Sequence, residues 1–145
     1  MVPEKTKILI VESFQANIEL IVQELEKGLT HYNFEIANSK KEFKRMLLAY
    51  KPDLILSNNI FNSFDGLSLF VLKKKLAPQT PFIFVSYPAR EEQMIEFFKN
   101  GLTDFVFKEN LSSLPTIIKR ALQDIKKNKK NEASNSKEQF RIQEL

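Results

Sequence analysis

The chain has 145 residues, of which 43% are apolar and 28% are charged. This length and balance predict one globular domain with a hydrophobic core and exclude wholesale disorder. The absence of cysteine excludes disulfides and thiolate zinc sites, and a single histidine excludes a multi-histidine metal site. The apolar runs are too short for a membrane span and residues 1–7 lack an apolar signal region, so we expect a cytoplasmic protein.

The net charge of +4 comes from the C-terminal stretch of the chain. Residues 119–145 hold eight basic and four acidic residues, whereas residues 1–118 hold fourteen of each. The basic residues at the C-terminus are interleaved with Glu and Asn, so they offer only a weak electrostatic binding site for a polyanion. We therefore expect no nucleic-acid partner, and no membrane partner either.

Short apolar runs alternate along the chain with longer segments of helical periodicity. The short runs are expected strands, at residues 8–11, 34–37, 54–56, 82–85 and 105–107. Apolar residues spaced three or four apart predict helices near residues 18–29, 43–50, 69–72, 95–98 and 114–125. Ser39 and Glu42 form a predicted capping box, Gly101 is the expected end of the fourth helix, and Pro115 fits the first turn of the fifth. The three lysines at 73–75 are expected to be a solvated helix end.

Regular alternation of strand and helix predicts parallel strands joined by right-handed crossovers. The runs at 8–11, 54–56 and 82–85 are apolar throughout, so we expect central strands, whereas Glu35 interrupts the second run and indicates an edge strand. In open sheets of this class, binding sites form at the carboxyl ends of the strands. The polar residues expected there are Glu12, Ser13, Ser57, Asn58, Asn59, Ser86, Tyr87, Lys108 and Glu109.

The residues at these strand ends resemble the receiver domains of two-component response regulators, over about residues 5 to 125. The run from Pro52 to Leu56 resembles the strand before the phosphoacceptor, Asp65-Gly66 the end of the loop after it, and residues 100–108 the segment that ends in the switch lysine. The resemblance implies an α/β, flavodoxin-like (βα)5 three-layer sandwich with a parallel five-stranded sheet in the order 2-1-3-4-5. It also implies a receiver-like domain over 1–125 and, at 126–145, a basic helical extension or linker to a following module, as in multidomain sensor proteins.

Carried over residue by residue, the chemistry of the family is incomplete in this chain. Asn58 stands where receivers have the aspartate that accepts the phosphoryl group, and a carboxamide has no anionic oxygen to act as the nucleophile. Glu12 and Ser13 stand where receivers have the acidic pair that helps to hold Mg²⁺. One carboxylate together with Lys108 gives the pocket a formal charge of zero, so we expect no Mg²⁺ site, no other cofactor and no enzymatic activity.

Three other positions match the residues that switch receivers between states. Ser86 matches the switch hydroxyl, Phe105 the switch aromatic residue and Lys108 the switch lysine, which we expect to pair with Glu12 or to bond to Asn58. Structural roles remain as alternatives for most of these positions. They are a helix cap for Glu12 and Ser13, a turn for Asn58, a strand-end hydroxyl for Ser86 and plain core for Phe105.

The resemblance therefore predicts a degenerate receiver, or pseudo-receiver, that acts through protein contacts. The expected partners are a histidine kinase, an output domain or a second copy of the chain, bound through the face of the fourth helix, fifth strand and fifth helix, where Phe97, Phe98 and Phe105 lie. The alternative is a conventional response regulator that a histidine kinase phosphorylates at a non-standard acceptor. A flavodoxin-type cofactor protein is disfavoured because residues 12–17 hold no hydroxyl- and glycine-rich phosphate loop.

Overall fold

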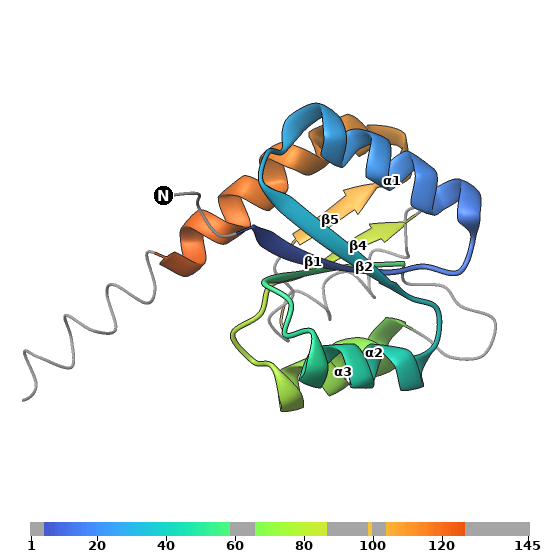
Figure 1. Cartoon of the computed structure of the whole chain (residues 1–145), viewed down its shortest axis with the longest axis vertical. Coiled ribbons are helices and arrows are strands. Elements are labelled where there is room, and N and C mark those ends of the chain that lie inside the picture. Colours follow the sequence, from blue (N-terminus) through green and yellow to red (C-terminus); the bar gives the residue numbers. More distant parts are fainter. Residues whose placement is uncertain (1–4, 59–65, 87–98, 100–103, 127–145) are drawn as a thin grey trace, which may run out of the picture.

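The computed structural model describes residues 5–58, 66–86, 99 and 104–126. Five parallel strands form one sheet in the order β2-β1-β3-β4-β5 (Figure 1). The strands are β1 (Thr6–Val11), β2 (Tyr32–Ala37), β3 (Leu54–Ser57), β4 (Phe82–Ser86) and β5 (Asp104–Phe107). The predicted flavodoxin-like fold and its strand order are confirmed.

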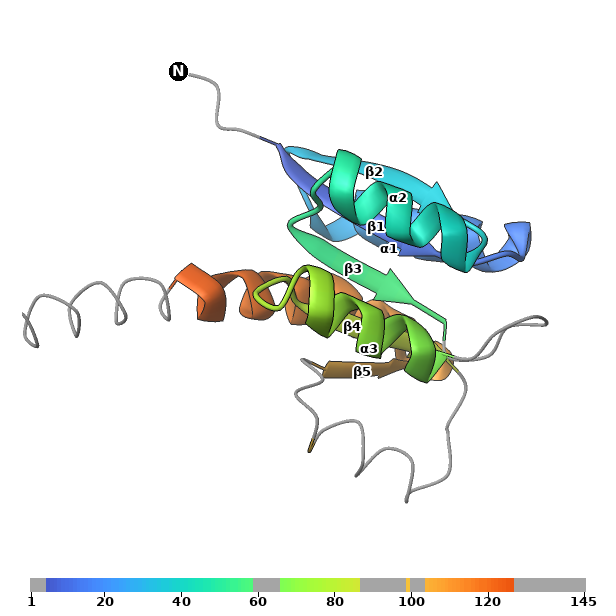
Figure 2. The same cartoon turned by 90° about the horizontal axis from the view of Figure 1, so that it is seen from below.

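Helices cover both faces of the sheet and make the molecule three layers thick (Figures 1 and 2). α1 (Gln15–Gly28) and the helix over residues 114–126 lie on one face, and α2 (Lys40–Ala49) and α3 (Gly66–Leu76) lie on the other. A 3₁₀ segment, η1 (Lys108–Ser113), connects β5 to the helix over 114–126. The predicted fourth helix, its cap at Gly101 and residues 127–145 of the predicted extension lie outside the described residues. Among the helices of the described ranges, none has the length and apolar character to cross a bilayer.

The order of the strands follows from their apolar patterns. Residues 8–11 of β1 and residues 54–56 of β3 are fully buried, and in β4 Phe82, Ile83 and Phe84 are as well. Helices on both faces explain why a central strand has no polar face. β2 alternates between half-buried and exposed residues and lies at the edge of the sheet, as its interrupted pattern predicts.

The two buried layers differ in chemistry. The layer under α2 and α3 is aromatic and includes Phe43, Phe70, Phe82, Phe84 and Phe105. Its rings meet edge to face, and the centroids of Phe82 and Phe84 are 5.0 Å apart with the planes at 77°. The buried residues of the layer under α1 and the helix over 114–126 are aliphatic. The sheet thus separates a layer rich in phenylalanine from an aliphatic one.

α1 and the helix over residues 114–126 meet at Gly28 and Pro115. A Cβ atom at position 28 would lie 2.3 Å from the Cβ of Pro115, which is far inside van der Waals contact. Gly28 is therefore required for this close approach. Pro115 lies in the first turn of its helix, as predicted, where the missing amide donor has no helical partner to lose.

The capping box that the sequence predicts at the start of α2 is confirmed. Ser39 is the N-cap of α2, and its Oγ accepts a hydrogen bond from the Glu42 N–H at 3.2 Å. The Glu42 carboxylate in return accepts from the N–H of Asn38 at 3.0 Å, one residue before the cap. Ser13, in contrast, does not cap α1, whose N-cap is Phe14 without a side-chain bond.

The prediction of a solvated lysine run at the end of α3 is wrong for one residue. Lys73 is 5% exposed, whereas Lys74 and Lys75 are exposed. Its Nζ donates to the backbone oxygen of Pro78 at 3.1 Å and lies 6.0 Å from the centre of the Phe70 ring. Burial lowers the pKa of Lys73, and the nearby Lys74 ammonium lowers it further.

Candidate functional site

Glu12 and Asn58 are held by the sheet itself, although each follows the end of its strand. The Glu12 N–H donates to the backbone oxygen of Ala37 at 3.1 Å, and the Asn58 N–H donates to that of Val11 at 3.1 Å. These bonds continue the ladders of β1 with β2 and of β3 with β1 by one residue. Because β1 and β3 are neighbours and parallel, the two side chains start from adjacent points on the same edge.

The Glu12 side chain is 1% exposed and fully engaged in hydrogen bonds. Its Oε1 accepts from the backbone N–H groups of Ser13 at 3.0 Å and Phe14 at 3.1 Å. Its Oε2 accepts from Nδ2 of Asn58 at 3.0 Å. Three N–H donors compensate the carboxylate for its loss of water. Glu12 therefore holds the backbone just before α1, although it does not cap the helix itself.

Asn58 is 6% exposed and forms a bond within the pocket. Its Nδ2 points at the Glu12 carboxylate, and its backbone oxygen accepts from Oγ of the buried Ser57 at 2.8 Å. Of the two alternatives that the sequence left open, a turn bond to its own backbone or a polar bond in the pocket, the structure contains the pocket bond. An amide that bridges two strand ends in this way is part of the scaffold of the site.

The remaining predicted site residues lie along the same edge of the sheet, as far as they are described. The Ser13 side chain is exposed beside Glu12. Ser86 is the last residue of β4 and pairs in register with Phe107, and Lys108 follows Phe107 directly. The structure describes Ser86 and Lys108 by backbone alone, so the predicted contact of Lys108 with Glu12 or Asn58 lies outside the described side chains.

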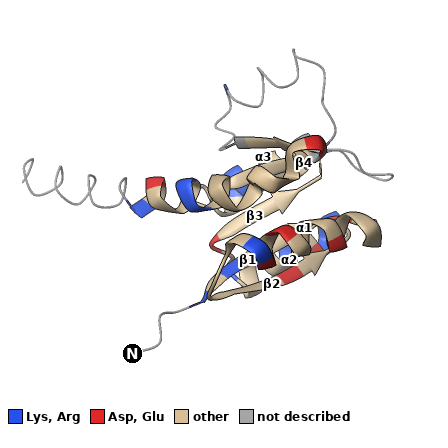
Figure 3. Ribbon diagram, turned by 90° about the horizontal axis from the view of Figure 1, so that it is seen from above, with Lys and Arg blue, Asp and Glu red and all other residues tan. Residues whose placement is uncertain are grey.

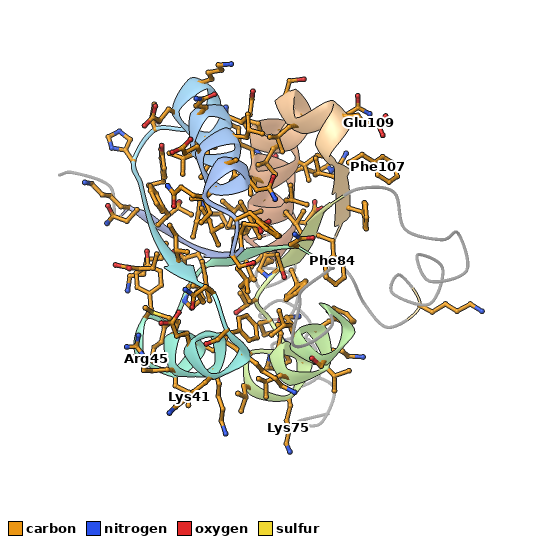
Figure 4. All side chains as sticks on the ribbon, turned by 90° about the vertical axis from the view of Figure 1, so that its right-hand side faces the viewer. Lys41, Arg45, Lys75, Phe84, Phe107 and Glu109 are labelled. Atoms are coloured by element: carbon orange, nitrogen blue, oxygen red, sulfur yellow. The ribbon has the colours of Figure 1, made fainter. Side chains whose placement is uncertain are left out.

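Phe105 is a core residue in this structure. It is 9% exposed, and its ring centre lies 6.2 Å from that of Phe84 and 5.0 Å from that of Phe107. The labelled Phe84 and Phe107 side chains can be followed in Figure 4. Phe105 therefore supplies no exposed aromatic ring for the predicted dimer face, and Phe97 and Phe98 lie outside the described residues.

The acidic groups near this edge are few. Asp53 lies at the other end of β3, where its Oδ2 accepts from the backbone N–H of Lys7 at 2.8 Å. Within the described ranges, no three side chains of the His, Cys, Asp and Glu types come together in a way that could hold a metal ion. Among the described residues at this edge, Glu12 is the buried carboxylate beside the Asn58 amide, and Glu109, two residues after β5, is exposed.

Sequence reasoning missed two exposed apolar side chains on and just before α1. Phe14 is 55% exposed and Leu20 is 51% exposed, at the start of α1. Leu20, Val85 and Leu111 line a shallow hollow where α1, β4 and η1 meet. The available signal was Phe14 itself, a large apolar side chain in a polar segment between a strand and a helix.

Comparison with known proteins agrees with the fold described above. The family model described as the response regulator receiver domain matches residues 8–122. No curated protein matches the sequence closely enough to be counted as a relative.

Solved structures share the fold over most of the chain. A response regulator receiver domain protein (CheY-like) from Methanospirillum hungatei JF-1 is 25% identical, with a TM-score of 0.77, over 86% of this chain and 99% of the other. The signal receiver domain of a signal transduction histidine kinase from Syntrophus aciditrophicus is 27% identical, with a TM-score of 0.71, over 83% and 92%. A signal receiver domain of an HD domain-containing protein from Pseudomonas fluorescens Pf-5 is 18% identical, with a TM-score of 0.78, over 90% and 96%, and supports the fold alone.

Proposed function

The chain belongs to the response regulator receiver family of two-component signalling, and we propose that it is a pseudo-receiver, which signals through protein contacts and accepts no phosphoryl group. The observation that carries this proposal is the hydrogen bond from Nδ2 of Asn58 to Oε2 of Glu12 at 3.0 Å. It joins the two side chains that stand at the phosphoacceptor and acidic-pair positions of the family. Receiver domains interact with histidine kinases and output domains. We propose that this chain keeps such protein contacts and signals through them without a phosphoryl group.

The chemistry of Asn58 supports the absence of phosphoryl transfer. Attack on phosphorus needs an anionic or activated oxygen, and the carboxamide oxygen is neutral. The amide nitrogen donates its proton to Glu12, so it presents N–H to the pocket and no lone pair. Asn58 is therefore a hydrogen-bond donor at a position where acyl-phosphate chemistry requires a nucleophile.

The neighbouring carboxylates do not replace it. Both oxygens of Glu12 already accept hydrogen bonds, and attack by either would leave buried N–H groups without an acceptor. Asp53 is bonded to the N–H of Lys7 at the opposite end of the sheet. The four residues of β3 that separate Asp53 from Asn58 place the two roughly 16 Å apart along the strand direction.

The donor set also does not suit Mg²⁺, the metal that the family implies for this site. Mg²⁺ takes hard, preferably anionic oxygens in tight octahedral geometry. Glu12 directs its oxygens at three N–H groups, and Asn58 directs N–H at Glu12, so binding the ion would break these bonds. With Lys108 counted, the formal charge of the pocket is zero, and little electrostatic attraction for a dication remains.

The surface next to this edge supports signalling by contact. Phe14 and Leu20 each expose more than half of their surface, although Glu12 fixes the backbone of Phe14. Apolar side chains on a fixed backbone lose little conformational freedom when a partner covers them. A partner that docks on Phe14 would lie against a residue whose backbone N–H is bonded to Glu12.

The proposal is tested by incubating the protein with acetyl phosphate and Mg²⁺ and measuring its intact mass. We expect no mass change for the wild-type chain and a gain of one phosphoryl group for the triple variant E12D/S13D/N58D, which restores three aspartates to the same scaffold. The single variant S13D is the matched control and should gain nothing. A phosphoryl gain by the wild-type protein would contradict the proposal and support a conventional response regulator with a non-standard acceptor.

A further inference from the structure

The outer surface of α2 and α3 carries six exposed basic residues, and a seventh on these helices, Lys73, is buried. These two helices hold seven of the fourteen Lys and Arg residues of positions 1–118, against one acid, Glu42. The Glu42 carboxylate is bonded to the Asn38 N–H at the helix start. Figure 4 shows Lys41, Arg45 and Lys75 on the outer side of the two helices, away from the sheet. The balanced charge of the body therefore conceals a strongly basic surface.

Each of the two helices also exposes an apolar side chain among these cations. Leu48 is 55% exposed and follows Lys44 and Arg45 by one helical turn. Val71 is 57% exposed and precedes Lys74 and Lys75 by one turn. We call the surface formed by these six residues the basic face. Exposed apolar side chains contribute little to contacts with phosphates and favour an acidic protein surface that also offers apolar area.

A surface of this complementary kind lies on the opposite side of the same chain. A groove of about 340 Å³ runs between α1 and the edge strand β2. Its lining includes the apolar side chains of Ile18, Val22, Phe34 and Ile36 and the carboxylates of Glu19 and Glu26. Both carboxylates are exposed and form no ion pair with described residues, whereas Glu24 pairs with Lys27 at 3.4 Å. We call this the acidic groove.

We propose that the basic face of one copy of the chain docks in the acidic groove of a second copy. Glu19 and Glu26 are seven residues apart, which is about 10 Å along α1. Packed helices have axes about 8–10 Å apart, and α2 and α3 lie side by side (Figure 2). One α1 can thus direct one carboxylate at the cations of each helix, while Leu48 and Val71 face the apolar floor of the groove.

The positions of the two surfaces determine the kind of assembly. The acidic groove lies on the α1 side of the sheet and the basic face on the α2–α3 side, and Figure 3 marks the charged residues on both. A contact between two different surfaces leaves one free surface of each kind at the ends of the pair. The association is therefore head-to-tail and continues beyond a dimer. It also covers the side chains of Phe34 and Ile36, which the edge strand β2 contributes to the groove.

Analytical ultracentrifugation of the full chain tests the proposal through a charge swap. We expect the wild-type protein to form a concentration-dependent series of oligomers at about 20 mM NaCl and to dissociate at about 500 mM NaCl. The variants E19K/E26K and K44E/R45E should each weaken association about tenfold or more. An equimolar mixture of the two should restore it, because the reversed charges match again. The matched control K119E/K126E has the same change in charge as K44E/R45E outside both surfaces, and should associate like the wild type.

Four results would overturn the proposal. They are a wild-type protein that stays monomeric at low salt, a mixture that does not recover association, a control that loses association equally, and a dimer that grows no further. A monomer whose Lys44 and Arg45 bind a short DNA duplex would also overturn it and would assign the basic face to a polyanion. Recovery in the mixture further shows that both variants are folded.

Discussion

Glu12 and Lys73 are both charged side chains that the fold buries, and their surroundings differ. Glu12 is 1% exposed and accepts three N–H donors from the ends of two neighbouring strands. Lys73 is 5% exposed and has the Pro78 oxygen as its hydrogen-bond acceptor and the Phe70 ring beside it. One charge is surrounded by matched hydrogen bonds, and the other is set largely against apolar groups.

The different surroundings of the two buried charges indicate that they have different roles in the structure. Glu12 and Asn58 form a small network, in which Oε1 of the carboxylate holds the backbone that follows β1 and Oε2 joins it to the residue that follows β3. Lys73 has a backbone oxygen as its hydrogen-bond acceptor near the end of α3, and burial lowers its pKa. The comparison leads us to regard the Glu12–Asn58 pair as a structural replacement for a ligand site. It is tested by variants of each residue, beginning with the variant of largest expected effect.

Replacing Glu12 should have the largest effect. In E12A, the N–H groups of Ser13 and Phe14 and the amide of Asn58 lose a buried acceptor, so we expect unfolding to become easier by about 3 kcal/mol. Urea unfolding followed by circular dichroism measures this loss. E19A, which removes an exposed carboxylate from α1, should change stability by less than about 0.5 kcal/mol. A loss below about 1 kcal/mol in E12A would mean that the network contributes little.

The variant N58D should have the next largest effect on stability. It places a second carboxylate about 3 Å from that of Glu12, and we expect a loss of about 2 kcal/mol at neutral pH. Like-charge repulsion raises the pKa of the pair in the folded state. The cost is therefore present above that pKa and disappears as the pH falls through it.

Thermal unfolding of N58D with and without Mg²⁺ distinguishes repulsion from a packing defect. We expect millimolar Mg²⁺ to restore part of the lost stability in N58D and to leave the wild type unchanged. The matched control is N33D, which makes the same substitution at an exposed position of β2. Its stability should change with neither Mg²⁺ nor acid. Equal stability of N58D and the wild type without Mg²⁺ would be inconsistent with the bond that we describe.

Removing the charge of Lys73 should have a smaller effect, of opposite sign. Because the folded-state pKa of Lys73 is lowered, the unfolded chain binds more protons between the two pKa values, and the free energy of unfolding rises with pH there. K73M should lack this rise and should be about 1 kcal/mol more stable at neutral pH. The exposed Lys75 provides the control K75M, which should follow the wild type. Parallel stability profiles of K73M and the wild type from pH 7 to about 10 would argue against a buried ammonium.

The two serines near helix starts give the smallest effects. S39A should cost about 0.5–1 kcal/mol, because the N–H of Glu42 loses its cap. S13A should cost almost nothing, because Glu12, and not Ser13, bonds to the backbone before α1. Urea unfolding of both variants measures the two stability losses. An equal loss in both would instead favour the helix cap that the sequence left open as an alternative role for Ser13.

The parts of the structure that sequence predicted well depend on local pattern. The uninterrupted apolar runs of β1, β3 and β4 required burial on both faces, and Glu35 in β2 required an edge. The capping box of α2 spans four consecutive residues, so spacing alone specifies it.

The parts that sequence did not predict depend on contacts between distant residues. Asn58 and Glu12 are 46 positions apart, and only the register of β1 with β3 shows that the amide reaches the carboxylate. Lys73 is part of a lysine triplet, and the Pro78 oxygen and the Phe70 ring distinguish it from its neighbours. The balanced charge of residues 1–118 gave no sign that α2 and α3 would place their cations on one surface.

The central claim is that Asn58 and Glu12 are bonded to each other and unavailable to Mg²⁺ and phosphoryl groups. The most direct measurement is an NMR titration with Mg²⁺ that follows the side-chain NH₂ of Asn58 and the backbone amides of Ser13 and Phe14, which donate to Glu12. We predict that these resonances keep their positions through millimolar Mg²⁺ and that the Asn58 NH₂ exchanges slowly with solvent. Saturable shifts of the three signals, together with rapid exchange of the Asn58 NH₂, would contradict the account.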